Sequence, residues 1–84
     1  MNNKRNQADI VYLTNLAASC IAEKRFDDAI DNGVNILNID NINVDALYIL
    51  ASAYMHKDDF AKAIFYIEKV LAIDELYVGA YIVL

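Results

Sequence analysis

Apolar residues recur along the chain at the spacing of an α-helix. In residues 9–23 they fall at positions i, i+3, i+4 and i+7, and the same spacing returns in 26–39, 44–57 and 60–73. Short polar segments at 23–25, 41–43 and 57–59 separate these stretches. The pattern predicts four helices over these ranges and the start of a fifth near residue 76. Asp58 or Asp59 suits the N-cap of the fourth helix, because a carboxylate there accepts from exposed backbone amides.

The helical pattern repeats itself after 34 residues. Residues 10–43 align with 44–77 without a gap, with nine identical residues of which all but one are apolar, and a third copy begins at Val78. Each copy holds two helices joined by a short turn, which predicts an all-α fold of stacked antiparallel helix-turn-helix repeats. We expect the repeat domain to cover residues 9–84, after a disordered polar lead at 1–8.

The second copy carries a spacing that resembles the tetratricopeptide repeat, namely Leu–x2–Leu–Ala–x2–Tyr–x5–Phe–x2–Ala at Leu47, Leu50, Ala51, Tyr54, Phe60 and Ala63. On this resemblance, 10–43 and 44–77 are two full repeats and 78–84 opens a third. The resemblance implies a short right-handed solenoid and binding of a protein or peptide. The small Ala51 and Ala63 let the two helices approach, and Tyr54 and Phe60 fill the space beside them.

Two positions of the first copy depart from this pattern. Cys20 stands where the family usually has Tyr; it lies on the apolar stripe of the first helix, which predicts an unreactive core thiol. Gly33 stands where a large apolar residue is usual, at a cost of about 1 kcal/mol relative to Ala in a helix. Gly33 could permit a close contact or leave a small hollow, and we expect a merely tolerated substitution.

The resemblance implies a concave groove lined by the first helix of each repeat. By register, the exposed stripe of these helices also includes Val11 and Asp45. The residues that we predict to bind a partner in this groove are Thr14, Ala18, Ile21, Tyr48, Ser52, Met55, His56 and Ile82. The alternative is that the stripe covers part of the chain's own core or a neighbouring repeat. Chaperone-binding members grip a C-terminal carboxylate with cations, and Thr14 and Ala18 supply none here.

Composition narrows the function further. Seven Lys and Arg against twelve Asp and Glu give a net charge of −5. We do not expect so acidic a chain to bind nucleic acid or an anionic membrane surface. His56, Asp58 and Asp59 are too few ligands for a transition-metal site, and no nucleophile–base pair or phosphate loop is recognisable. We therefore expect a non-catalytic protein without cofactor or metal. The single cysteine excludes an intrachain disulfide, and the lack of a credible targeting signal favours a cytoplasmic protein.

The end of the sequence suggests rival functions. Residues 76–84 are almost entirely apolar, and no polar capping helix follows them. We expect either a fragment of a longer repeat array or an end that a second copy of the chain covers, giving a homodimer. A structural self-assembly element is thus the alternative to a partner-binding module. A third interpretation is an accessory repeat region of a larger protein whose activity lies beyond Leu84.

Overall fold

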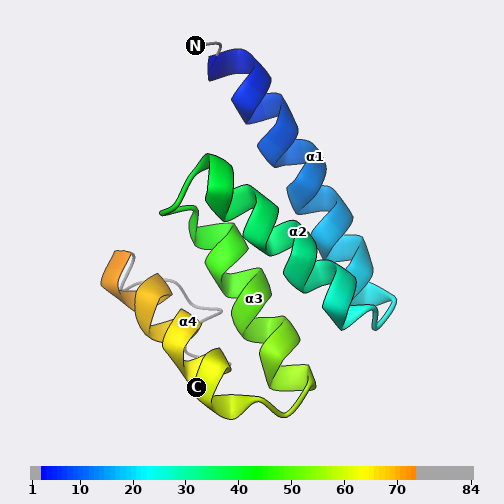
Figure 1. Cartoon of the computed structure of the whole chain (residues 1–84), viewed down its shortest axis with the longest axis vertical. Coiled ribbons are helices and arrows are strands. Elements are labelled where there is room, and N and C mark those ends of the chain that lie inside the picture. The colour runs from blue at the N-terminus through cyan, green and yellow to red at the C-terminus, as the bar shows by residue number, and fades with distance from the viewer. Residues whose placement is uncertain (1–2, 74–84) are drawn as a thin grey trace.

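The computed structural model describes residues 3–73, which form four α-helices and the turns between them. Helix α1 spans Asn3–Ala22, α2 spans Phe26–Ile39, α3 spans Val44–His56 and α4 spans Phe60–Ile73. Successive helices run in opposite directions and stack in chain order (Figure 1). The predicted all-α repeat fold is confirmed. The predicted bounds of α2 and α4 are correct, and α3 ends one residue earlier than expected; the predicted helix start near residue 76 lies outside the described residues.

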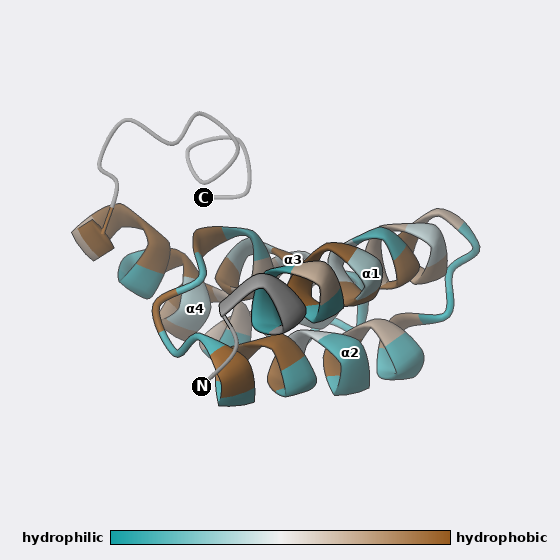
Figure 2. Ribbon diagram, turned by 90° about the horizontal axis from the view of Figure 1, so that it is seen from above, coloured by the Kyte–Doolittle hydropathy of each residue, from teal (hydrophilic) through white to brown (hydrophobic). Residues whose placement is uncertain are grey.

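The first helices of the two copies, α1 and α3, lie on the same side of the molecule. Helix α1 contacts both α2 and α3, and α3 also contacts α2 and α4. Figure 2 shows α1 and α3 next to each other, with α2 below them. A groove between α1 and α3 is therefore built from side chains of both repeats.

The turns within the two repeats have the same backbone geometry. Lys24 has a φ of 63°, and the amide of the following residue donates to the carbonyl of Cys20 at 2.7 Å. Asp58, 34 positions later, also has a φ of 63°, and the next amide donates to the carbonyl of Tyr54 at 2.9 Å. Helices α1 and α3 are thus each followed by a turn residue of left-handed conformation, and the next backbone amide donates to a carbonyl in the last turn of the helix.

Side-chain caps start two of the helices. The Asn43 side chain accepts a hydrogen bond from the amide of Ala46 at 2.9 Å, at the start of α3. At the start of α4, Asp59 Oδ1 accepts from the amide of Lys62 at 3.3 Å. Of the two predicted cap candidates, Asp59 makes the bond, because Asp58 occupies the left-handed turn position.

Small residues allow the helices to approach closely. Six alanines of α1 to α4 have no exposed surface, and they alternate with larger buried side chains such as Ile36, Leu50, Ile67 and Val70. The described residues include no buried polar side chain. Cys20 is 1% exposed within the cluster that joins α1, α2 and α3, so the prediction of a core thiol is confirmed.

The first helix begins earlier than the sequence pattern predicts. We expected a disordered lead at residues 1–8, but α1 starts at Asn3. Residues 3–8 carry Lys4, Arg5, Gln7 and Ala8, which have good intrinsic helix propensity. Extending a helix that is already nucleated adds one hydrogen bond per residue fixed, so these polar residues continue α1 without an apolar face of their own.

Gly33 makes a close contact, contrary to our expectation of mere tolerance. A Cβ added to Gly33 would lie 3.0 Å from Leu50 Cγ and 3.1 Å from Leu50 Cδ2. Leu50 has no exposed surface and therefore little room to move. Because Gly33 has no side chain, α2 and α3 pack closely against each other at Leu50.

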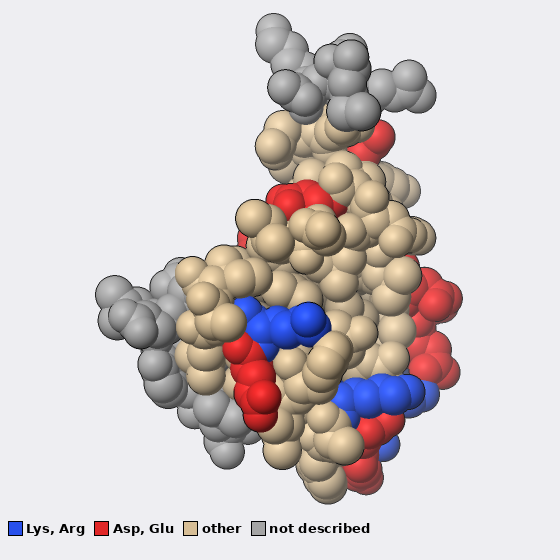
Figure 3. Space-filling view, turned by 60° about the vertical axis from the view of Figure 1, so that its left-hand side comes forward, with Lys and Arg blue, Asp and Glu red and all other residues tan. Residues whose placement is uncertain are grey.

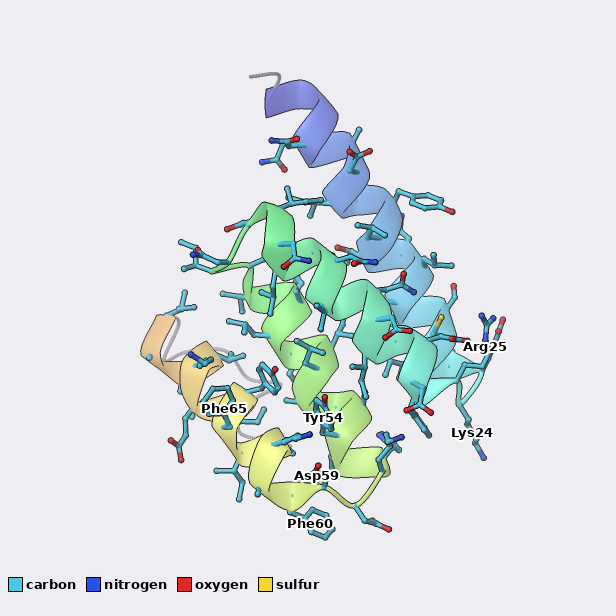
Figure 4. The ribbon with its side chains drawn as sticks, in the orientation of Figure 1. Lys24, Arg25, Tyr54, Asp59, Phe60 and Phe65 are labelled. Carbon is cyan, nitrogen blue, oxygen red and sulfur yellow. The ribbon has the colours of Figure 1, made fainter. Side chains whose placement is uncertain are left out.

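Phe60 does not fill the space between helices, which corrects a second prediction. Its side chain is 52% exposed, and Figure 4 shows its ring projecting outward at the start of α4. The equivalent Phe26 of the first copy is half-buried and stacks on His56 at the end of α3. Phe26 is covered by the first helix of the next repeat, whereas α4 is the last described helix.

Candidate interaction groove

An apolar hollow opens between α1 and α3. It has a volume of about 250 Å³ and is lined by Ala18, Ile21, Tyr48, Ile49 and Ser52. Ala18 and Ile21 lie three residues apart on α1, and Tyr48 and Ser52 lie four apart on α3, so each pair shares one helix face. We call this space the apolar hollow. It brings together four of the eight predicted binding residues.

A second space, which we call the polar hollow, lies nearer the N-terminal ends of the same two helices. Its volume is about 350 Å³, and its lining includes Gln7, Val11, Thr14, Asn15, Asn43 and Asp45. Thr14 Oγ1 donates its proton to the Ile10 carbonyl at 2.7 Å. Toward the hollow, the Thr14 hydroxyl oxygen can therefore only accept a hydrogen bond.

The two hollows divide the predicted residues into groups. Thr14 lines the polar hollow, while Ala18, Ile21, Tyr48 and Ser52 line the apolar hollow. Tyr48 also packs against the buried cluster of α3 and α4, so part of its ring belongs to the core, as the alternative interpretation expects.

The remaining three predicted residues lie elsewhere. Met55 is half-buried in α3 and lines neither hollow. The His56 ring stacks on Phe26 with centroids 4.7 Å apart, and its Nδ1 lies 2.8 Å from the Ser52 carbonyl oxygen. His56 thus contacts the start of α2. Ile82 lies outside the described residues.

Sequence reasoning missed several residues of the groove. Ile49 lines the apolar hollow although it is only 9% exposed, because its side chain forms the floor between the two helices. Gln7 was assigned to a disordered lead, and it reaches the polar hollow only because α1 starts at Asn3. Asn15 and Asn43 were not on the predicted stripe. A helix-propensity argument for residues 3–8 could have found Gln7.

Asp45 is the only charged residue among those that line the two hollows. It is exposed in the first turn of α3, and within the described part of the chain it forms no ion pair. The ion pairs that the structure contains lie at the helix turns: Arg25 with Glu23 and Asp28, Lys57 with Asp27, and Lys62 with Asp59.

Elsewhere on the surface, basic side chains lie beside acidic ones. On the face drawn in Figure 3, basic side chains adjoin acidic ones, other acidic side chains stand apart from them, and wide uncharged areas lie between. The hydrogen bond to Asp27 raises the pKa of Lys57 above its ordinary value, and hydrogen bonds to Glu23 and Asp28 do the same for the pKa of Arg25. These cations are thus committed to neighbouring carboxylates, away from the groove.

The described residues that line the two hollows include no His or Cys side chain. Among residues 3–73, no three His, Cys, Asp or Glu side chains come together as metal ligands. The Cys20 thiol lies in the core and receives a long hydrogen bond from Asn32 Nδ2, at 3.8 Å. None of the described helices is both long and apolar enough to cross a membrane. The arrangement can bury apolar side chains and accept hydrogen bonds.

Comparison with known proteins agrees with this architecture. Searches of curated proteins and of solved structures found no significant match. A family model described as tetratricopeptide repeat matches residues 21–81, which is most of the chain. The matched region begins near the end of α1 and includes all of α2, α3 and α4. The 34-residue period, the antiparallel helix pairs and this match agree, and the chain belongs to the tetratricopeptide repeat family.

Proposed function

We propose that the chain is a non-catalytic interaction module that binds a segment of a partner protein in the groove between α1 and α3. Tetratricopeptide repeats generally mediate protein–protein interaction. The observation that carries the proposal is the apolar hollow, which is open at the surface between Ala18 and Ile21 on one helix and Tyr48 and Ser52 on the other. An exposed apolar depression of this kind is typical of an interaction surface.

The size of the apolar hollow favours the side chains of a bound peptide over an enclosed small ligand. Sites that enclose a whole small molecule have volumes of roughly 300–1,000 Å³. The apolar hollow, at about 250 Å³, is below that range and suits one or two side chains of a longer segment. The adjoining polar hollow can accept hydrogen bonds from the same segment, whether the segment is extended or helical.

Substitutions in the hollow test the proposal. A display library of random dodecapeptides is selected on the wild-type chain, and the best peptide is then titrated against variants. Tyr48→Ala removes one wall and should weaken binding by about 1–2 kcal/mol. Ala18→Leu should weaken it by filling the hollow. Because Ala18 is exposed, this change leaves the core intact.

We also expected Met55→Ala to weaken binding. Because Met55 lines neither hollow, we now expect this variant to have a smaller effect than Tyr48→Ala.

Phe65→Ala is the matched control, because Phe65 is an aromatic residue on α4 that is 54% exposed and does not line the groove. Binding should be unchanged in this variant. Equal affinity of the wild-type chain, Tyr48→Ala and Ala18→Leu would contradict the proposal.

Self-association is a second candidate function, favoured by the outer surface of α4. Phe60, Ile64, Phe65 and Ile73 of this helix are 52%, 44%, 54% and 45% exposed. In the first copy, Ile30 packs against the core cluster that α3 completes, whereas its equivalent Ile64 is exposed. Apolar side chains of this kind can be covered by a second chain. Residues 76–84, the segment that we predict to pair, lie outside the described residues.

A further inference from the structure

We infer that the groove selects a partner segment that carries a Lys or Arg two or three residues away from an apolar anchor. The inference rests on the proposed function and adds the chemistry of the partner. The apolar side chain enters the apolar hollow, and the cation lies in the polar hollow beside Asp45.

The charge of the polar hollow carries the first step. Asp45 is exposed, is the one charged residue among the groove's lining residues, and has no ion pair within the described part of the chain. The N-terminus of α3 contributes a positive partial charge of roughly half a unit. The full negative charge of Asp45 exceeds it, so the local balance is negative.

The side-chain amides of Gln7, Asn15 and Asn43 in the polar hollow can donate or accept, whereas two other groups disfavour an anion. The amide of Ala46, in the first turn of α3, already donates to the Asn43 side chain and is not available to an anion. Thr14 can only accept, since its proton is donated to the Ile10 carbonyl. A carboxylate in this hollow would face Asp45, and the described residues that line the hollow include no cation to compensate, which is unfavourable. An ammonium or guanidinium group finds acceptors.

The spacing follows from helix geometry. Asp45 precedes Tyr48 by three residues and Ser52 by seven, which places the carboxylate about 5–10 Å along α3 from the apolar hollow at 1.5 Å per residue. An extended peptide advances about 3.3 Å per residue. An extended segment therefore has its apolar anchor and its cation two or three residues apart.

The test uses the random dodecapeptide library selected on the wild-type chain and, in parallel, on Asp45→Asn. Asp31→Asn is the matched control, because Asp31 is an exposed acidic residue on α2 that forms no ion pair with any described residue and does not line the groove. Both variants lose one negative charge. Thermal unfolding of each variant verifies that it remains folded.

We expect peptides selected on the wild-type chain to share an apolar residue with Lys or Arg two or three positions away. For such a peptide, Asp45→Asn should weaken binding about two- to fivefold at low salt, as for an exposed ion pair. Asp31→Asn should leave the affinity unchanged. The difference should shrink at about 0.5 M salt, where exposed charges are screened.

Other outcomes separate the two claims. Selected peptides without a basic residue, or equal affinities for Asp45→Asn and Asp31→Asn, overturn the inference while groove binding stands, provided that Ala18→Leu still weakens binding. If Ala18→Leu has no effect, or if no peptide is enriched on the wild-type chain, the proposed function fails and the inference fails with it.

Discussion

At the scale of single residues, Gly33 shows how a gap in one helix fits a side chain of the next. The position holds Ile67 in the second copy, where the side chain is fully buried. In the first copy, Leu50 occupies the space that a Cβ at position 33 would need. A Cβ added to Gly33 would lie only 3.0 Å from Leu50 Cγ. The departure from the repeat pattern is therefore a specific contact between α2 and α3, and it has a measurable consequence.

Gly33→Ala should destabilise the chain. Helix propensity alone would stabilise α2 by about 1 kcal/mol. Overpacking against Leu50, which is fully buried, costs about 1–3 kcal/mol. The net effect should be a loss of about 1 kcal/mol in the free energy of unfolding, measured by urea titration. Asn35→Ala, at an exposed position of α2, is the control and should not destabilise. A clearly more stable Gly33→Ala would show that Leu50 moves aside easily.

The turn residues give a second prediction at this scale. Lys24 and Asp58 both have a φ of 63°, where a side chain costs about 1–2 kcal/mol and glycine none. Glycine adds about 0.5–1 kcal/mol of backbone entropy cost on folding. Lys24→Gly should therefore raise stability by about 0.5–1 kcal/mol, and Asp58→Gly by less, because Asp tolerates this conformation better. Thermal unfolding of both variants measures this, and a destabilised Lys24→Gly would argue against the turn geometry.

At the scale of elements, an exposed ion pair connects the start of α2 to the residue after α3. Lys57 Nζ donates to Asp27 Oδ1, and this hydrogen bond raises the pKa of Lys57 above its ordinary value of 10.5. Because the pKa of Lys57 is raised in the folded state, the ion pair contributes fully to the free energy of unfolding below about pH 10.5. This contribution is lost as the pH rises through the folded-state pKa of Lys57.

Comparison of the wild-type chain with Lys57→Gln isolates this contribution. The wild-type chain should be slightly more stable at neutral pH, by a small amount because both side chains are exposed. The difference should stay constant up to about pH 10.5 and then close. Lys24→Gln, which removes an exposed lysine that forms no ion pair in the described residues, is the control. A difference that persists unchanged well above pH 11 would show that it does not come from the ion pair.

Much of the element order could be predicted from the sequence, because the 34-residue period aligns two copies of each helical pattern and of each turn between helices. The bounds of α2 and α4 follow from it. The apolar period alone missed the start of α1, because that period ends at Ile10 and only helix propensity indicates the preceding residues. The exposure of Phe60 could not be found either, since it depends on which helix lies next to α4.

The candidate site was partly predictable for the same reason. Helix register places Ala18, Ile21, Tyr48 and Ser52 on one face, and the structure has all four around the apolar hollow. Register does not say that a side chain at the end of a helix turns toward another element, as His56 does toward Phe26. The acceptor character of the polar hollow depends on side-chain hydrogen bonds, which spacing alone does not reveal.

At the scale of the whole molecule, the exposed apolar surface of α4 predicts concentration-dependent association. We expect light scattering to give a mass that rises above 9.5 kDa as the concentration increases. Ile64→Ser should shift this rise to higher concentrations, because it removes apolar surface that is 44% exposed. Val34→Ser, at a position of α2 that is 42% exposed and lines neither hollow, is the control. A constant monomer mass at millimolar concentration would rule out self-association as the function.

The central claim is that the groove between α1 and α3 binds a peptide segment. Amide NMR spectra of the labelled chain, recorded while a library-selected peptide is added, test it most directly. The account predicts that the largest shifts occur at Ala18, Ile21, Tyr48 and Ser52, with smaller shifts near Asp45. Shifts concentrated at Phe60 and Ile64 on α4, with the groove amides unchanged, would contradict it.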